Sequence, residues 1–244
     1  MIIIYFLIVH WYTSLFFQTF FLHRYSAHKH FTMSNFWEKV FYFLSWFTQG
    51  FTALSPNVYG KLHRMHHAYA DTEKDVHSPK YDKTIVAMML RTDKIFRGIK
   101  LGEIEVDERF CKNLPDWKFM EKYAYKIPSR ILWISVYIGI YYSFVPENAV
   151  WMWALLPFHF LMTLIHGVMI NWFAHRIGYR NYEVSDTSTN LMPFDIITLG
   201  EGYHNNHHAY SGDANFSKKW YEFDLCYPAI VLFNALGIIE LNKK

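Results

Sequence analysis

The 244-residue chain is 52% hydrophobic and 20% aromatic, with 18% charged residues and a net charge of +3. This composition excludes a disordered chain, and so mild a charge argues against nucleic acid as a partner. Two cysteines cannot build a four-cysteine zinc site or an iron–sulfur centre, whereas 14 histidines are many for this length. Together these features indicate a membrane protein that holds metal.

Three segments are predicted to cross a membrane, whose hydrocarbon core is about 30 Å thick. They lie at about 2–22, 129–146 and 149–171. The first contains no Lys, Arg, Asp or Glu, and its polar residues His10, Ser14 and Gln18 recur every four positions. This polar stripe is expected to face protein and not lipid. The second and third spans are so close in sequence that they form a tight hairpin.

Segment 36–55 is apolar, but Ser, Thr, Gln and Gly weaken its second half, so it either crosses or lies on the membrane surface. If it does not cross, all 24 Lys and Arg fall on one side, 18 in residues 23–130 and 6 in residues 171–244. The positive-inside rule favours this arrangement and makes that side cytoplasmic. We therefore expect one all-α domain over 1–244, with a non-crossing helix at 36–55 and a cytoplasmic helical cap formed by 56–127 and 172–244.

Histidines gather in three clusters, each of which follows an apolar segment. The clusters are His23-Arg-Tyr-Ser-Ala-His28, His63-Arg-Met-His66-His67 and His204-Asn-Asn-His207-His208. Positions i, i+3 and i+4 of a helix share a face, so each His-x-x-His-His motif directs three imidazoles toward one volume. Chance predicts only about 0.05 copies of this motif in such a chain, yet two are present. All eight imidazoles are therefore candidate metal ligands.

Ligand number and type restrict the metal site. Eight imidazoles exceed the four ligands of one tetrahedral zinc and suit two ions. Imidazole binds iron, copper, nickel and zinc alike, so the ligand type does not select the metal. Zinc proteases need Glu after the first His, where this chain has Arg64 or Asn205, so the base for peptide hydrolysis is missing. The three clusters meet on one side of the membrane only if segment 36–55 does not cross, which agrees with the charge count.

These clusters, in this order and between these apolar segments, resemble those of the membrane fatty-acyl desaturases, most nearly the acyl-CoA Δ9 branch and its short bacterial relatives. The Gly-Glu-Gly-Tyr that precedes His204, the Asp-Val-His-Ser-Pro of residues 75–79, and Asn171-Trp-Phe-Ala-His175 match as well. The resemblance implies a non-haem di-iron centre of two Fe²⁺ ions, with O₂ as co-substrate. The implied metal ligands are His23, His28, His63, His66, His67, His175, His204, His207 and His208, with Asn171 acting through a water molecule.

The resemblance further implies an oxygen-dependent fatty acyl desaturase that places a cis double bond, at Δ9, in a saturated chain. Its substrate would be an acyl-CoA, an acyl chain on acyl carrier protein or an acyl lipid, and its location the inner membrane of a bacterial cell. The sequence has no His-Pro-Gly-Gly haem motif, so a separate ferredoxin or cytochrome b5 is the expected electron donor. The alternatives are a membrane di-iron hydroxylase or other oxygenase and a non-enzymatic protein that binds or transports metal.

Residues around the clusters have weaker predictions. A metal-bound histidine usually donates its second ring N–H to a partner, and Glu201 is the first candidate for that role. Asp71, Asp75 and Asp195 are further candidates, and His77 has either such a role or a place beside the substrate. Four other histidines are not expected to bind metal: His10, His159 and His166 as buried polar groups, and His30 as a solvated surface residue.

Overall fold

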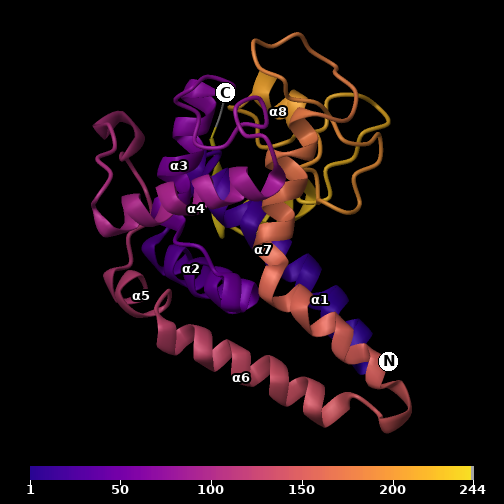
Figure 1. Cartoon of the computed structure of the whole chain (residues 1–244). Helices are drawn as coiled ribbons and strands as arrows, with labels where there is room; N and C mark the ends of the chain where they lie inside the picture. The colour runs from indigo at the N-terminus through magenta and orange to yellow at the C-terminus, as the bar shows by residue number, and fades with distance from the viewer. Residues whose placement is uncertain (243–244) are drawn as a thin grey trace.

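The structure, a computed structural model, describes residues 1–242 and is mostly helical (Figure 1). The helix α1 (Ile2–Phe17) continues without a break into a π-helix, η1 (Gln18–Ala27). The remaining helices are α2 (Asn35–Gln49), η2 (Gly50–Thr52), α3 (Pro56–Tyr69), α4 (Ile85–Leu101), η3 (Glu108–Phe110), α5 (Lys118–Tyr123), α6 (Ile127–Phe144), η4 (Glu147–Leu155), α7 (Leu156–Asn171), η5 (Phe173–His175), α8 (His204–Ala209) and α9 (Tyr227–Ala235).

Two stretches within residues 1–242 are long and apolar enough to cross a membrane, Ile2–Ala27 and Glu147–His175. They contain the first and third predicted spans, and α1 packs against α7 along their length (Figure 1). The second predicted span is helical as α6 but is not one of these two stretches, since Ser129 and Arg130 make its first turn polar. That α6 crosses the membrane therefore stays a prediction.

Segment 36–55 forms α2 and then the short turn η2. At 15 residues, α2 is about 22 Å long, which is less than the roughly 30 Å hydrocarbon core. Phe41 and Tyr42 are buried against the protein, while Phe36, Phe43 and Phe47 are exposed. The short length of α2 favours the predicted surface helix, and its place relative to the membrane stays a prediction.

The cap has an aromatic core beside the end of α1. Phe20, Phe21, Phe31 and Phe41 are almost fully buried there and stack on one another. Two three-residue strands, β1 (Phe31–Met33) and β2 (Ile239–Leu241), pair antiparallel and attach the C-terminal segment to this core. The all-α prediction missed these strands, which are too short to give a pattern in the sequence.

The histidines of the apolar helices have polar partners within the protein. The Nδ1 atoms of His10 and His159 lie 2.7 Å apart, and the Nε2 atom of His159 lies 3.1 Å from the Tyr141 hydroxyl. His166 Nδ1 lies 3.3 Å from the Gln18 side-chain oxygen. All three histidines are buried, which confirms that they are buried polar groups with partners on neighbouring helices.

Candidate metal centre

The five-residue spacing of the first histidine cluster fits the π-helix in which it lies. In an α-helix His23 and His28 would point about 140° apart, since each residue turns the chain by 100°. A π-helix has i→i+5 hydrogen bonds, and here the His28 N–H donates to the His23 carbonyl (3.2 Å). The two rings consequently lie on one face, with centroids 5.0 Å apart.

The two His-x-x-His-His motifs lie on α3 and α8 and divide their histidines between two groups. On α3 the i and i+4 residues, His63 and His67, point into one group, and the i+3 residue, His66, points into the other. On α8 the division is reversed, because the i+3 residue His207 joins His63 and His67. Each helix therefore contributes to both groups, which places the two groups next to each other.

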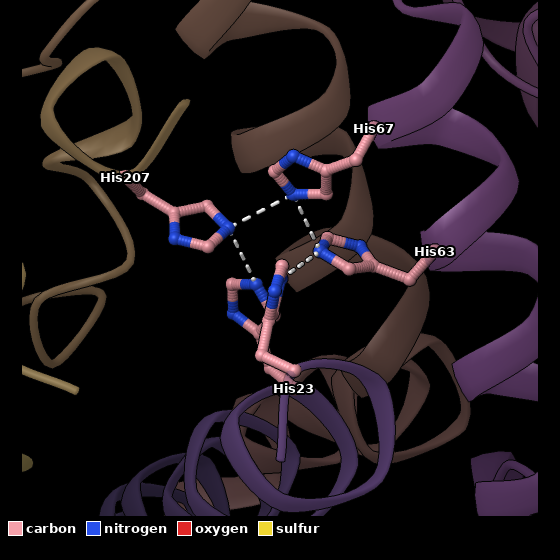
Figure 2. Close-up of side chains that lie close together, drawn as sticks. His23, His63, His67 and His207 are labelled. Carbon is pink, nitrogen blue, oxygen red and sulfur yellow. Dashed lines mark hydrogen bonds between the residues drawn. The ribbon is translucent and has the colours of Figure 1, made fainter. Parts of the chain in front are cut away.

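The first group, called here the five-histidine group, contains His23, His28, His63, His67 and His207. Figure 2 shows four of these side chains pointing toward one another from η1, α3 and α8. Successive Nε2 atoms lie 2.9–3.0 Å apart along the row His28, His63, His67, His207 and His23.

The second group, called here the four-histidine group, contains His66, His175, His204 and His208. His175 comes from η5 at the end of α7, and its Nε2 lies 3.0 Å from that of His204. The ring centroids of His67 and His208 are 4.6 Å apart, so the two groups share a boundary. The structure thus brings together all nine histidines that the sequence analysis identified.

The nitrogen positions fit bound metal ions. Two nitrogens bound at right angles to one ion, each at about 2.1 Å, would be about 3.0 Å apart, as in the five-histidine group. A tetrahedral site would need a separation of about 3.4 Å. Within residues 1–242, the buried Nε2 atoms of His66 and His208 have no hydrogen-bond partner, although each carries a lone pair that a metal would use.

The electrostatics of the site also fit metal binding, which requires neutral imidazole. Burial, helped by the neighbouring imidazoles, holds the pKa values of His63, His67, His204 and His207 well below the usual 6.5. Burial likewise lowers the pKa of His208 to about 4, against the opposing effect of Asp186. These five side chains are therefore neutral at neutral pH and offer a ring lone pair to a metal.

Acidic side chains hold the second ring nitrogen of several histidines. His23 Nδ1 donates to Glu201 (2.5 Å), and His66 Nδ1 donates to Asp75 (2.9 Å). His208 Nδ1 donates to Asp186 (2.8 Å). His175 Nδ1 donates to the Thr187 hydroxyl (3.3 Å), which in turn donates to Asp71. A carboxylate only accepts, so the metal-side Nε2 of each partnered histidine is the unprotonated nitrogen.

Glu201 is the most strongly held of these carboxylates. It accepts from His23, from the Thr19 hydroxyl and from Arg24, which is itself fully buried and paired with Asp224 (2.7 Å). Burial alone would raise the pKa of Glu201, but the His23 ring and the Arg24 guanidinium lower it to about 2. The carboxylate is thus ionised at any physiological pH.

Two of the weaker predictions, for Asp195 and His30, need correction, and one carboxylate was missed. Asp195 is not a partner of any imidazole in residues 1–242, because its carboxylate accepts from the backbone of Thr198, Gly200 and Gly202 instead. The sequence analysis missed Asp186, whose only signal was a carboxylate in the segment between His175 and His204. His30 is 4% exposed, with its ring stacked on His28 and its Nε2 donating to Ser211, so it is not a solvated surface residue.

Asn171 and His77 line a cavity beside the centre. Its volume is about 240 Å³, and its wall includes His23 and His63 of the five-histidine group. Most of the remaining wall is apolar, formed among others by Leu15, Leu54, Leu62, Met89, Phe96, Leu164 and Ile170. His77 stacks near His66 (4.4 Å between centroids) but is not part of either group. The first cavity is therefore a largely apolar space between α1, α4 and α7 that reaches the five-histidine group.

A second cavity, of about 510 Å³, adjoins the first and shares Leu54, Asp93 and Phe96 with it. Its wall contains four cationic side chains, from α4 and from the start of α6: Arg97, Lys100, Lys126 and Arg130. The wall also contains the carboxylates of Asp93 and Glu121, so its charged groups have a net positive charge, and this cavity adjoins the apolar one beside the histidines.

Comparison with known proteins assigns the family. A sequence model of the fatty acid desaturase family matches residues 1–233. The chain is 29% identical to an sn-1 stearoyl-lipid 9-desaturase of Anabaena variabilis, over 72% of this chain and 61% of the relative. It is 28% identical to the Delta-9 desaturase-like 4 protein of Arabidopsis thaliana, over 90% and 69%. It is 30% identical to an icosanoyl-CoA 5-desaturase of Limnanthes douglasii, over 72% and 47%.

The chain therefore spans roughly half to two thirds of the length of these curated relatives. The family model, by contrast, matches almost the whole chain, including all three histidine clusters and His175. On that match, the chain belongs to the fatty acid desaturase family.

Proposed function

We propose that the protein is an oxygen-dependent fatty acyl desaturase that introduces a cis double bond at position 9 of a saturated acyl chain. The observation that carries the proposal is the pair of adjacent histidine groups, of five and four members, beside an apolar cavity. We propose iron as the metal in both groups and all nine histidines as its ligands. Asn171, on the cavity wall, would act through a bound water molecule.

The proposed topology places the metal centre on the cytoplasmic face of the bacterial inner membrane. Segments 2–22, 129–146 and 149–171 would cross, and 56–127 and 172–244 would form the cap of a single domain over 1–244. The position of the histidines supports this, because those of the centre lie at or beyond the cap-side ends of α1 and α7. A metal-transport protein would instead need metal-binding groups along a path through its spans.

A redox pair of iron ions, when bound, would supply the activation of O₂. The protein's part is to bring nine imidazoles together and to fix the orientation of three of them, since Glu201, Asp75 and Asp186 hold the Nδ1 atoms of His23, His66 and His208. The apolar wall of the first cavity excludes water and holds two adjacent methylene groups close to the histidines. Overall, R–CH₂–CH₂–R′, O₂, two electrons and two protons give R–CH=CH–R′ and two water molecules.

The two adjoining cavities suggest how an acyl substrate would lie. The chain would occupy the apolar cavity, and its anionic carrier would lie in the basic one beside Lys100, Lys126 and Arg130. The relatives are named for both lipid-linked and CoA-linked substrates, so an acyl lipid, acyl-CoA or acyl carrier protein agrees with this placement. Two electrons would come from a separate ferredoxin or cytochrome b5.

Expression in a bacterial host that lacks the double bond, followed by mass spectrometry of its fatty acids, tests the function. We expect a new cis alkene at position 9, absent in the variant His66→Ala. Asp107→Asn, on an exposed loop outside the centre, is the control and should keep full activity. Hydroxylated chains without alkene would make the protein a hydroxylase, and unchanged fatty acids with a metal-loaded protein would refute both.

A further inference from the structure

Loop 193–199, which precedes Glu201 and α8, is folded around one buried carboxylate. Asp195 is 2% exposed and accepts the backbone N–H groups of Thr198, Gly200 and Gly202 at 2.8–2.9 Å. The buried Tyr203 hydroxyl donates to the Pro193 carbonyl (3.0 Å) and accepts from the Asp195 N–H. These bonds fix the loop's shape and join it to Gly200, Gly202 and Tyr203.

The same fold directs apolar side chains outward. Phe194, Ile196 and Ile197 lie within four consecutive positions and are 68%, 61% and 45% exposed. Single exposed apolar residues are ordinary, but three together on a loop held by an internal carboxylate form a patch that would otherwise face water.

The position of this patch indicates what covers it. The Trp11 indole N–H donates to the Ile197 carbonyl (3.1 Å), so the loop lies against α1 at Trp11. Trp11 precedes His23 by 12 residues, which is about 18 Å along a helix axis. It belongs to the stretch Ile2–Ala27, which is long and apolar enough to span a membrane. The loop therefore extends from the metal centre back along a membrane helix.

The patch is continuous with the outward flank of that helix. Ile8 is 48% exposed and lies one turn before Trp11 on the same face, and its neighbour Val9 is 57% exposed. If α1 crosses a bilayer, these side chains contact lipid, and so does the loop attached beside them.

We infer that loop 193–199 inserts Phe194, Ile196 and Ile197 into the bilayer beside α1. Pairing within the protein lowers the cost of irregular backbone at membrane depth, and here it covers the N–H groups of Asp195 and Thr198 and the carbonyls of Pro193 and Ile197. The inference does not depend on desaturase activity; it depends on α1 lying in the membrane.

Insertion would connect the bilayer with the metal centre. Asp195 holds the N–H groups of Gly200 and Gly202, which flank Glu201, and Glu201 accepts from His23 Nδ1. His204 of the four-histidine group lies two residues after Gly202. The lipid-contacting loop and the carboxylate that orients His23 therefore form one hydrogen-bonded unit.

Site-directed spin labelling of the full chain in phosphatidylcholine vesicles tests the insertion. Cys111→Ser and Cys226→Ala remove the native thiols, and single labels are then placed by Ile196→Cys and Phe194→Cys. Val9→Cys is the lipid-facing control, and Ser185→Cys, on an exposed loop, is the aqueous control. Accessibility to O₂ and to a water-soluble nickel chelate is measured for each label, together with the metal content, which reports intact folding.

We expect both loop labels to resemble Val9, with O₂ accessibility high and nickel accessibility several-fold below that of Ser185. Loop labels as accessible to nickel as Ser185, with Val9 protected, would overturn the insertion. A nickel-accessible Val9 would overturn it as well, because the loop would then lie beside a helix that is not in lipid. Two loop positions are used so that a folding defect in one variant does not decide the result.

Discussion

The substitution Asp186→Asn tests how the carboxylates control the centre. In the protein, one Asp186 oxygen accepts from the Ser188 N–H (2.8 Å) and the other accepts from His208 Nδ1 (2.8 Å). Asparagine can keep the Ser188 contact only by turning its NH₂ group toward His208. His208 Nδ1 must then accept, and its proton moves to Nε2, the atom that points into the four-histidine group.

The expected loss is confined to one metal ion. Removing the carboxylate partner of a metal-bound histidine typically costs 10–100-fold in affinity, or about 1.4–2.7 kcal/mol. Within residues 1–242, no histidine of the five-histidine group hydrogen-bonds to Asp186, so the metal affinity of that group should be unchanged.

Metal retention against a graded chelator measures this loss. The wild-type protein should release two ions per chain, and Asp186→Asn should release one of them at a 10–100-fold lower chelator concentration. Asp107→Asn makes the same chemical change on an exposed loop and should match the wild type. If both ions shift together, or if neither shifts, the assignment of Asp186 to one of two separate sites is wrong.

Three further predictions concern stability, measured by thermal unfolding in detergent. Arg24→Met leaves Glu201 and Asp224 buried without their cation and should lower the free energy of unfolding by about 3–5 kcal/mol. The control Arg97→Gln breaks an exposed ion pair and should lower it by less than about 1 kcal/mol. Equal losses in the two variants would contradict the burial argument. Gly50→Ala should lower the free energy of unfolding by about 1–3 kcal/mol, because φ is +58° and a Cβ would lie 1.8 Å from the Tyr137 hydroxyl. The control Gly139→Ala has open space around it and should be neutral or stabilising. For metal present at a hundredfold excess over its Kd, removal should cost about 2.7 kcal/mol for each of the two ions and lower Tm by about 5–10 °C per ion. An unchanged Tm would mean that the histidine groups do not bind the metal.

Local patterns in the sequence were sufficient to identify eight of the nine histidines, and the ninth, His175, came from the resemblance to the desaturases. The i, i+3, i+4 spacing on α3 and α8 depends only on helix geometry, so three imidazoles from each motif had to share a face. Counting Lys and Arg placed the three clusters on one side, and the structure brings the corresponding histidines together. Glu201 and Asp75 were identified because each lies near a cluster in the sequence.

The division of those histidines between two groups was not predictable, because it depends on how α3 and α8 face each other. His66 and His67 are adjacent in the sequence yet belong to different groups. Asp186 lies 22 residues from His208 in an irregular segment, and no periodic pattern relates the two. The π-helix of η1 was equally hidden, since its apolar sequence also suits an α-helix.

The iron content of the purified, iron-loaded protein tests the central claim most directly. If nine histidines from separate parts of the chain form two adjacent metal sites, elemental analysis should find two iron ions per chain. Saturation at a single ion, or a protein that retains zinc and excludes iron, would contradict the account.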